Sequence, residues 1–281
     1  MSPHNGEGMF NKPSNKLGHL VLASFLTLSA FSNTAIADDQ LKAAINAEER
    51  ADESVRDPFR NPYETLEFFG IKQGMTVVEL APSGGWYTEI LGPYLAAEGE
   101  LVAGHFNMER ENAPGYFARA MAAYKERIAD ENRFGEISIL PFDPPAKSSL
   151  GEPASADMVV SFRSVHGWKR DGVFADVIKS VHEVLKPGGV FGIVGHRLPE
   201  NGDDSVFTGY VKQSWVIEMA EANGLTFVEA SEVNANPKDT ADHTNGVWSL
   251  PPALNVDDDA QKELNRQIGE SDRFTLKFVK Q

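Results

Sequence analysis

The fold is decided by one stretch, Val77-Val78-Glu79-Leu80-Ala81-Pro82-Ser83-Gly84-Gly85-Trp86-Tyr87. Its apolar start indicates a short buried strand that ends in an acid, and a tight loop of small residues then enters a helix. In such a strand–loop–helix the loop backbone passes close to a ligand, and the helix N-terminus offers free N–H groups. The phosphate-binding form G-x-x-x-x-G-K-[ST] and the dinucleotide form G-x-G-x-x-G are both absent. The stretch therefore indicates a site for a nucleotide-like cofactor of another kind.

Predicted strands and helices alternate along the rest of the chain. We expect strands at residues 76–80, 100–104, 137–140, 157–162, 190–195, 225–233 and 274–279. We expect helices at 39–56, 63–69, 86–95, 116–128, 173–185 and 209–222. Lys186-Pro187-Gly188-Gly189 should stop a helix and connect it to the next strand. This alternation predicts an α/β fold with a Rossmann-like, doubly wound, mostly parallel sheet of seven strands.

The length allows one large domain or two small ones, and we expect one domain over residues 38–281. The chain has 281 residues, of which 41% are hydrophobic and 24% charged, as in ordinary globular proteins. N-terminal helices are expected over residues 38–70. Residues 234–270, rich in Asn, Asp and Pro and weakly periodic, are interpreted as an insertion over the site. Glu270, Asp272 and Arg273 are expected to form an ion-pair group beside it.

The N-terminus has the layout of a secretory signal peptide. Lys12 and Lys16 precede an apolar run at residues 17–31, and Ala35-Ile36-Ala37 supplies a small-x-small cleavage site. The alternative is a membrane anchor, but the run has roughly 15 residues against the ~20 that a spanning helix needs. We therefore expect residues 1–37 to be removed and residues 38–281 to be exported to the periplasm, without stable membrane insertion.

Charge and cysteine content exclude several classes of function. The net charge of −15 disfavours nucleic acid and anionic membranes as partners, because the long-range field repels both. The absence of cysteine excludes thiolate zinc sites and cysteine nucleophiles, and it is compatible with an oxidising compartment. The expected partner is a small molecule, and the oligomeric state stays open.

Polar side chains mark the ends of the predicted strands, where open parallel sheets bind their ligands. They are Glu79, His105, Asp143, Arg163, His166 and His196. We expect them to share one crevice at the carboxyl edge of the sheet.

Several motifs resemble those of the class I S-adenosylmethionine (SAM) methyltransferases. Glu79-x-Ala81-x-Ser83-x-Gly85 resembles the family's first motif, Asp/Glu-x-Gly-x-Gly-x-Gly, with two glycines replaced. Leu185-Lys186-Pro187-Gly188-Gly189-Val190 is similar to the block before the fifth strand, and Pro141-Phe142-Asp143 is similar to the segment after the third. The resemblance implies that the C-terminal strand runs antiparallel into the sheet.

Other blocks resemble the exported methyltransferases of bacteria. They are Arg56-Asp57 through Phe68-Phe69-Gly70, Arg163 to Trp168, Gly195-His196-Arg197, Asn236-Pro237-Lys238-Asp239, Trp248-Ser249-Leu250-Pro251-Pro252 and Gly269-Glu270-Ser271-Asp272-Arg273. The resemblance covers residues 60–281.

The resemblance also implies how SAM would be held. Glu79 would approach its amino-acid end, and Asp143 would accept a hydrogen bond from its adenine amine. His105 stands where the family has an acid for the ribose hydroxyls, and a neutral imidazole makes one donor and one acceptor contact. Arg163 is a further candidate contact. The loop would be lined by Ala81, Ser83, Gly84 and Gly85, with Ala81 held extended by Pro82.

Methyl transfer from a sulfonium depends mostly on holding the nucleophile in line with the methyl group. His166 and His196 are the candidate catalytic bases, because an imidazole titrates near neutral pH. They follow neighbouring strands and are expected to face one another. Trp86, Tyr87 and Trp168 are candidates for an aromatic wall beside the sulfonium. The expected function is SAM-dependent methyl transfer to a small molecule.

Two alternatives stay open at this point. The replaced glycines and His105 also suit an exported ligand-binding protein on a methyltransferase scaffold, without turnover. A metal site built from His105, Asp143, His166 and His196 is the other alternative, although no short His-x-x-x-His spacing supports it.

Overall fold

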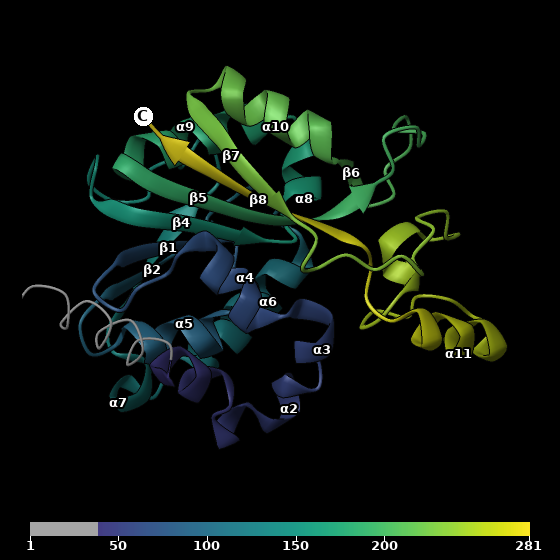
Figure 1. Ribbon diagram of the computed structural model, residues 1–281, viewed down its shortest axis with the longest axis horizontal. Helices are drawn as coiled ribbons and strands as arrows, with labels where there is room; N and C mark the ends of the chain where they lie inside the picture. The colour runs from purple at the N-terminus through teal and green to yellow at the C-terminus, as the bar shows by residue number, and fades with distance from the viewer. Residues whose placement is uncertain (1–38) are drawn as a thin grey trace, which may run out of the picture. The chain divides into compact units, whose positions relative to one another are not determined.

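The computed structural model describes residues 39–281, so the predicted signal peptide at 1–37 lies outside the described residues. The sheet has the strand order β3-β2-β1-β4-β5-β8-β7 (Figure 1). The strands are β1 (Thr76–Leu80), β2 (Glu100–Phe106), β3 (Ile137–Phe142), β4 (Ala156–Phe162), β5 (Leu185–Leu198), β6 (Val211–Lys212), β7 (Leu225–Ser231) and β8 (Arg273–Lys280).

The sheet is mostly parallel, as the sequence predicts. Strands β1 to β5 pair in parallel, and β8 is antiparallel to both of its neighbours, β5 and β7. The antiparallel strand implied by the family resemblance is therefore confirmed. An eighth strand, β6, was not predicted because it has two residues and pairs only with the end of β5.

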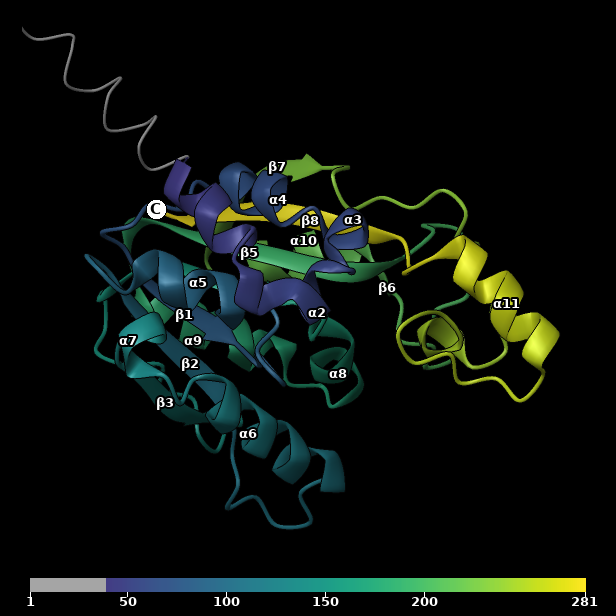
Figure 2. The ribbon, with the colours of Figure 1, turned by 90° about the horizontal axis from the view of Figure 1, so that it is seen from below.

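Helices cover both faces of the sheet (Figures 1 and 2). They are α2 (Ala51–Ser54), α3 (Asp57–Arg60), α4 (Pro62–Phe69), α5 (Thr88–Leu95), α6 (Gly115–Arg127), α7 (Glu131–Phe134), α8 (Val165–Arg170), α9 (Phe174–Val184), α10 (Gln213–Ala222) and α11 (Asp259–Ile268), with the 3₁₀ turns η1 (Glu48–Arg50) and η2 (Gly246–Ser249). Residues 39–45 are also helical. None of the helices within 39–281 is long and apolar enough to cross a membrane.

The strand pleat divides the core in two. In β1, Val78 and Leu80 pack with α9 and α10, whereas Val77 packs with α4 and α5 on the opposite face. In β4, Val159 lies on the first side and Val160 on the second. Because β1 and β4 are buried on both faces, they form the middle of the sheet and hold the loops that follow them in place.

Three local predictions were wrong. The helix expected over 39–56 is interrupted at Ala47, whose ψ of 137° is extended; the buried Arg50 then donates to the carbonyl of Ile45 and to Asp57. The helix expected from residue 209 begins at Gln213, because the preceding residues pair with β5. The helix before the Pro-Gly-Gly connector ends at Val184, as predicted, but the connector itself lies inside β5 as an irregularity, with Gly188 at φ +78°.

The helices α3, α7, α8 and α11 lie outside the predicted helical ranges. α8 follows β4 almost directly, and only one of its side chains, Val165, is buried. α11 lies inside the predicted insertion, beyond the sheet edge (Figure 1). Its sequence is mostly polar, although Ala260, Leu264 and Ile268 have helical spacing, and the buried Asn265 donates to the carbonyl of Ser249 at 2.8 Å.

Candidate functional site

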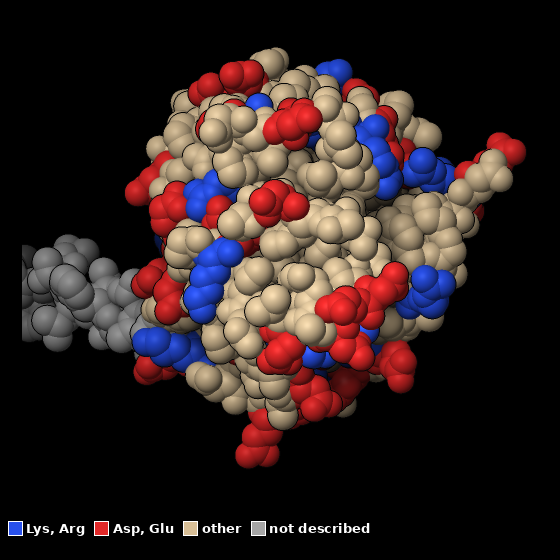
Figure 3. Space-filling view, turned by 90° about the vertical axis from the view of Figure 1, so that its right-hand side faces the viewer, with Lys and Arg blue, Asp and Glu red and all other residues tan. Residues whose placement is uncertain are grey.

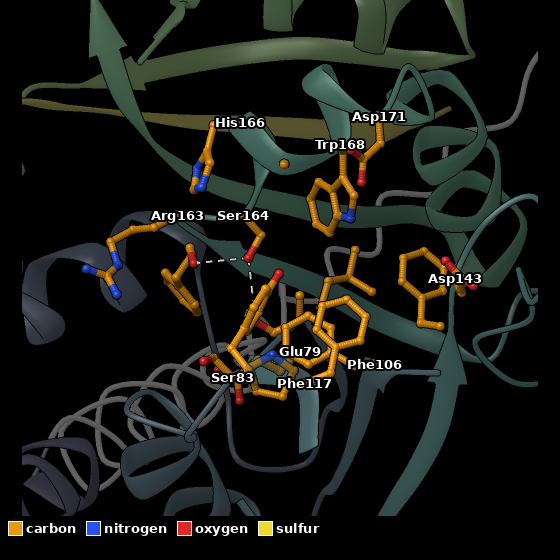
Figure 4. A pocket seen from close by; sticks show the side chains of 18 of the residues that line it. Glu79, Ser83, Phe106, Phe117, Asp143, Arg163, Ser164, His166, Trp168 and Asp171 are labelled. Carbon is orange, nitrogen blue, oxygen red and sulfur yellow. Dashed lines mark hydrogen bonds between the residues drawn. The ribbon is translucent and has the colours of Figure 1, made fainter. Parts of the chain in front are cut away.

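A pocket of about 490 Å³ lies at the carboxyl ends of the central strands (Figure 4). This volume is typical of small-molecule sites. Six of the predicted site residues line it: Glu79, Ala81, Ser83, Asp143, Arg163 and His166. Gly84, Gly85, His105 and His196 are not among its lining residues. The lining also includes Trp248 from the predicted insertion, which therefore reaches the site.

The loop after β1 has a left-handed backbone at alternate residues. Ala81 has φ +49°, Ser83 φ +55° and Gly85 φ +82°. The prediction that Pro82 keeps Ala81 extended is therefore wrong, and two residues with side chains adopt a conformation that favours glycine. A Cβ atom at Gly85 would lie 2.9 Å from Arg127, so glycine is required there for space as well. Such strain at a ligand-facing loop is common in functional sites.

His105 supports this loop from behind. Its Nε2 lies 2.9 Å from the carbonyl of Ser83, and the backbone N–H of Phe106 donates to its Nδ1 at 2.7 Å. The ring is fully buried, and burial lowers its pKa, so it is neutral and carries its hydrogen on Nε2. Both ring nitrogens are thus used within the protein, and His105 offers no free group to a ribose.

The neighbouring Phe106 faces the pocket instead. Its ring stacks on Phe117 of α6 with centroids 3.9 Å apart and an interplanar angle of 5°. Sequence reasoning missed both residues. The alternation of side chains along β2 places Phe106 on the opposite side from His105, and that alternation was the signal that could have found it.

Glu79 ends β1 in the core. Thr88 donates to its carboxylate at 2.6 Å. Burial raises the pKa of Glu79 to about 7, against the Thr88 hydrogen bond and the positive charge of Arg127. Glu79 is therefore more readily protonated near neutral pH than an exposed glutamate, and its protonated form would be able to donate a hydrogen bond.

Asp143 lies at the other side of the pocket from Arg163 (Figure 4). Its Oδ1 is 3.1 Å from Nη1 of Arg110, and its backbone pairs with Lys147. The carboxylate is 19% exposed, so one of its oxygens is held by Arg110 while the group stays accessible from the pocket.

The two candidate bases are neighbours. The ring centroids of His166 and His196 are 5.6 Å apart. His166 lines the pocket, and its Nδ1 has no hydrogen-bond partner among the described residues. Burial, together with the positive charges of Arg163 and Arg170, lowers its pKa to about 4. His196 is buried beside it, 2.5 Å from the hydroxyl of Ser271, and burial lowers its pKa well below the usual value.

Arg60 and Arg163 form one end of the pocket. Glu270 lies between them, with Arg60 Nε at 3.3 Å and Arg163 Nη1 at 4.0 Å from its carboxylate. Glu270 also pairs with Arg273, as the sequence predicts, whereas Asp272 pairs with Arg197 at 2.8 Å and was wrongly included in that group. Arg60 was missed, since nothing in its sequence context separates it from a surface arginine.

The metal alternative finds no geometric support. Within residues 39–281 no group of three or more His, Asp or Glu side chains is arranged to hold a metal ion. Its proposed members are also engaged elsewhere, since His105 supports the loop and Asp143 pairs with Arg110.

Comparison with known proteins agrees with the topology. No family model matches the sequence, and no curated protein does. A SAM-dependent methyltransferase from Aquifex aeolicus is similar in structure, with a TM-score of 0.54 and 14% identity, covering 86% of this chain and 97% of its own. The chain has the fold of the class I SAM-dependent methyltransferases.

The same fold also carries other chemistry. The [4+2]-cyclase SpnF is similar at a TM-score of 0.53 and 14% identity, over 79% of this chain and 80% of its own. At these identities the likeness concerns the fold alone, and the activity has to be argued from the pocket.

Proposed function

We propose that the protein is a SAM-dependent methyltransferase that acts on a small molecule in the periplasm. The observation that carries this proposal is the convergence of Glu79, Ser83, Asp143 and His166 on one pocket at the carboxyl edge of a methyltransferase sheet.

The lining residues fit two of the three parts of SAM. The loop from Ala81 to Gly85 would hold its amino-acid end. Phe106, Phe117 and Phe142 would enclose the adenine, and Asp143 would accept a hydrogen bond from the adenine amine. The third part, the ribose, has no evident partner at His105, because the ring of His105 is hydrogen-bonded to the carbonyl of Ser83.

When bound, the sulfonium supplies an electrophilic methyl group. The chain then has to hold the acceptor in line and keep water out. With a pKa of about 4, His166 is neutral at physiological pH. It is a weak base, and in the tautomer that carries its hydrogen on Nε2 its unpartnered Nδ1 would accept a hydrogen bond from a hydroxyl or amine of the acceptor. Trp168 and Trp248 would cover this part of the pocket.

Titration calorimetry of the purified protein with SAM and S-adenosylhomocysteine tests the proposal. We expect micromolar binding of both, weakened at least tenfold by Asp143→Asn. The matched control is Asp171→Asn, since Asp171 also lines the pocket and also pairs with an arginine, Arg170 at 2.7 Å, but is not a predicted contact of the adenine. Turnover in an acceptor screen should then fall in His166→Ala while the affinity for S-adenosylhomocysteine stays within threefold.

No binding at millimolar ligand would contradict the proposal. The ligand-binding protein without turnover would then be preferred, and the engagement of both His105 ring nitrogens is the observation that favours it.

Export is tested separately. The mass of the protein recovered from the periplasmic fraction should correspond to a chain that begins at Asp38. Recovery of the intact chain from the cytoplasm would contradict export without affecting the proposed reaction.

A further inference from the structure

One end of the pocket concentrates positive charge. Arg60, at the end of α3, and Arg163, directly after β4, both line it. Figure 4 shows Arg163 on the opposite side of the cavity from Asp143, with His166 pointing toward the arginine. Two guanidinium groups from separate elements thus meet at the end of the pocket that is distant from the predicted adenine contact.

The charge at this end is not balanced within the protein. Arg56 and Arg273 lie behind Arg60 and Arg163, and in the described part of the chain Glu270 is the one acidic group within ion-pair distance of these four arginines. Burial disfavours the charge on Glu270, but the arginines outweigh it and hold its pKa at about 2. Four positive charges therefore surround a single negative one. Buried charge is costly unless it is paired, so the group favours a further anion.

Hydrogen-bond donors at this end are also unused. The side chain of Arg60 is 4% exposed, and its Nη2 has no partner among residues 39–281. Its guanidinium lies over the ring of Trp86, 4.3 Å from the centroid, which fixes its plane. Arg163 is 31% exposed and reachable from the pocket. A planar guanidinium held in this way matches the paired oxygens of a carboxylate or phosphate.

The surroundings make this local charge distinctive. The chain carries a net charge of −15, and on the face shown in Figure 3 Lys and Arg side chains are scattered among Asp and Glu, without a continuous basic patch. Anions are repelled by such a protein at long range. A ligand that nevertheless bears an acid would need local positive charge, and the pocket provides it in the buried Arg60 and the partly exposed Arg163.

We propose that the methyl acceptor carries a carboxylate or phosphate group and that Arg60 and Arg163 bind it. This inference rests on the proposed function, which places SAM against Ser83, Phe117 and Asp143 and leaves the arginine end to the acceptor. The acid would anchor the acceptor, and His166 beside it would meet the hydroxyl or amine that receives the methyl group.

The first experiment measures the thermal stability of the protein against inorganic phosphate and acetate, at constant ionic strength and with chloride as the reference. We expect a saturable rise in melting temperature with phosphate or acetate, and at least a tenfold weaker apparent affinity in Arg163→Gln. Arg163→Lys should lose less, because it keeps the charge. Arg170→Gln is the matched control, since Arg170 lines the same pocket but is paired with Asp171; it should stay within twofold of the wild type.

A second arm separates the acceptor from the amino-acid carboxylate of SAM. S-adenosylhomocysteine carries that carboxylate, and 5′-methylthioadenosine lacks it. We expect Arg163→Gln to bind both within threefold of the wild type. A tenfold loss for S-adenosylhomocysteine alone would assign the arginines to the cofactor and overturn the inference.

The absence of any specific effect of phosphate and acetate, or equal effects in Arg163→Gln and the wild type, would also overturn it. Failure of the proposed function is seen independently, as a lack of S-adenosylhomocysteine binding by the wild-type protein.

Discussion

The ring of His105 lies 2.9 Å from the carbonyl of Ser83 and thereby ties the end of β2 to the loop after β1. The two residues are 22 positions apart. The bond is buried on the histidine side, where the backbone N–H of Phe106 occupies the second ring nitrogen. A position at which the related fold is expected to contact a ribose is thus used here to shape the loop.

His105→Leu should therefore destabilise the protein. The substitution removes the hydrogen bonds that the buried ring makes with the carbonyl of Ser83 and the N–H of Phe106. Since Ser83 is exposed, water replaces part of the loss, and we expect the free energy of unfolding, measured by urea denaturation, to fall by about 1–3 kcal/mol. His105→Gln keeps a donor and should lose less; equal losses in the two variants would show that the hydrogen bond to Ser83 is unimportant.

Ala81→Gly should stabilise the protein. Ala81 has a left-handed backbone, which costs a residue with a side chain about 1–2 kcal/mol. Glycine does not have this cost, but it loses about 0.5–1 kcal/mol more conformational entropy on folding than alanine. The expected net gain is about 0.5–1 kcal/mol by urea denaturation. Ala123→Gly, at an exposed position inside α6, is the control and should lose about 1 kcal/mol. Losses of similar size at both positions would rule out strain at Ala81.

Glu79→Gln should change how stability depends on pH. The pKa of Glu79 is about 7 in the folded protein and 4.5 without burial, so between these values the unfolded chain gives up its proton first. The wild type therefore loses stability as pH rises from 4.5 to 7, by about 3 kcal/mol at 1.36 kcal/mol per pKa unit. The variant should match the wild type near pH 4 and exceed it by about this amount at pH 8. Unfolding curves at both pH values test this, and a constant difference would contradict it.

Glu270→Gln should be strongly destabilising. It leaves Arg56, Arg60 and Arg273 buried or half-buried without a carboxylate, and breaking a buried pair costs about 3–5 kcal/mol. Glu232→Gln is the control, since that carboxylate is 67% exposed beside Arg197 and should cost less than about 1 kcal/mol. Chemical denaturation with and without phosphate makes the measurement. Phosphate should restore part of the loss in Glu270→Gln; similar losses in the two variants would contradict the charge argument.

Ligand binding should change tryptophan fluorescence. Three of the four tryptophans, Trp86, Trp168 and Trp248, line the pocket, and Trp215 does not. We expect S-adenosylhomocysteine to shift or quench the emission, and Trp215→Phe to retain the whole change. A signal that disappears in Trp215→Phe would place the ligand elsewhere.

The strands were largely predictable because their signal is local. β1 and β4 each contain a short apolar run, Val77-Val78 and Met158-Val159-Val160, and both lie in the middle of the sheet as such runs should. The antiparallel β8 followed from the family resemblance and is confirmed by its pairing with β5. By contrast, α11 is held by a polar contact of Asn265, and β6 exists only because β5 offers it an edge. The apolar positions of α11, Ala260, Leu264 and Ile268, have helical spacing but stand among polar residues, and β6 is too short to show any periodicity.

The site was only partly predictable for a similar reason. Glu79, Asp143 and His166 could be predicted to lie at the pocket because they stand at or just after the carboxyl ends of parallel strands, which the topology brings together. Which way a side chain points at a strand end depends on the pleat, and this separates Phe106 from His105. Arg60 comes from a helix outside the sheet, and its partner Glu270 is 210 positions away in the sequence. No local sequence pattern around either residue indicates this ion pair.

The position of β8 between β5 and β7 has a consequence during synthesis. β8 begins at Arg273, 75 positions after β5 ends at Leu198, yet it lies between β5 and β7. At a translation rate of about 5–20 residues per second, β5 waits roughly 4–15 s with one edge unpaired. β7 is synthesised within this interval. If it paired with the free edge of β5, it would occupy the position that belongs to β8. Unpaired edges are where chains join one another, so nascent chains of this protein are most exposed to mispairing just before their last strand arrives.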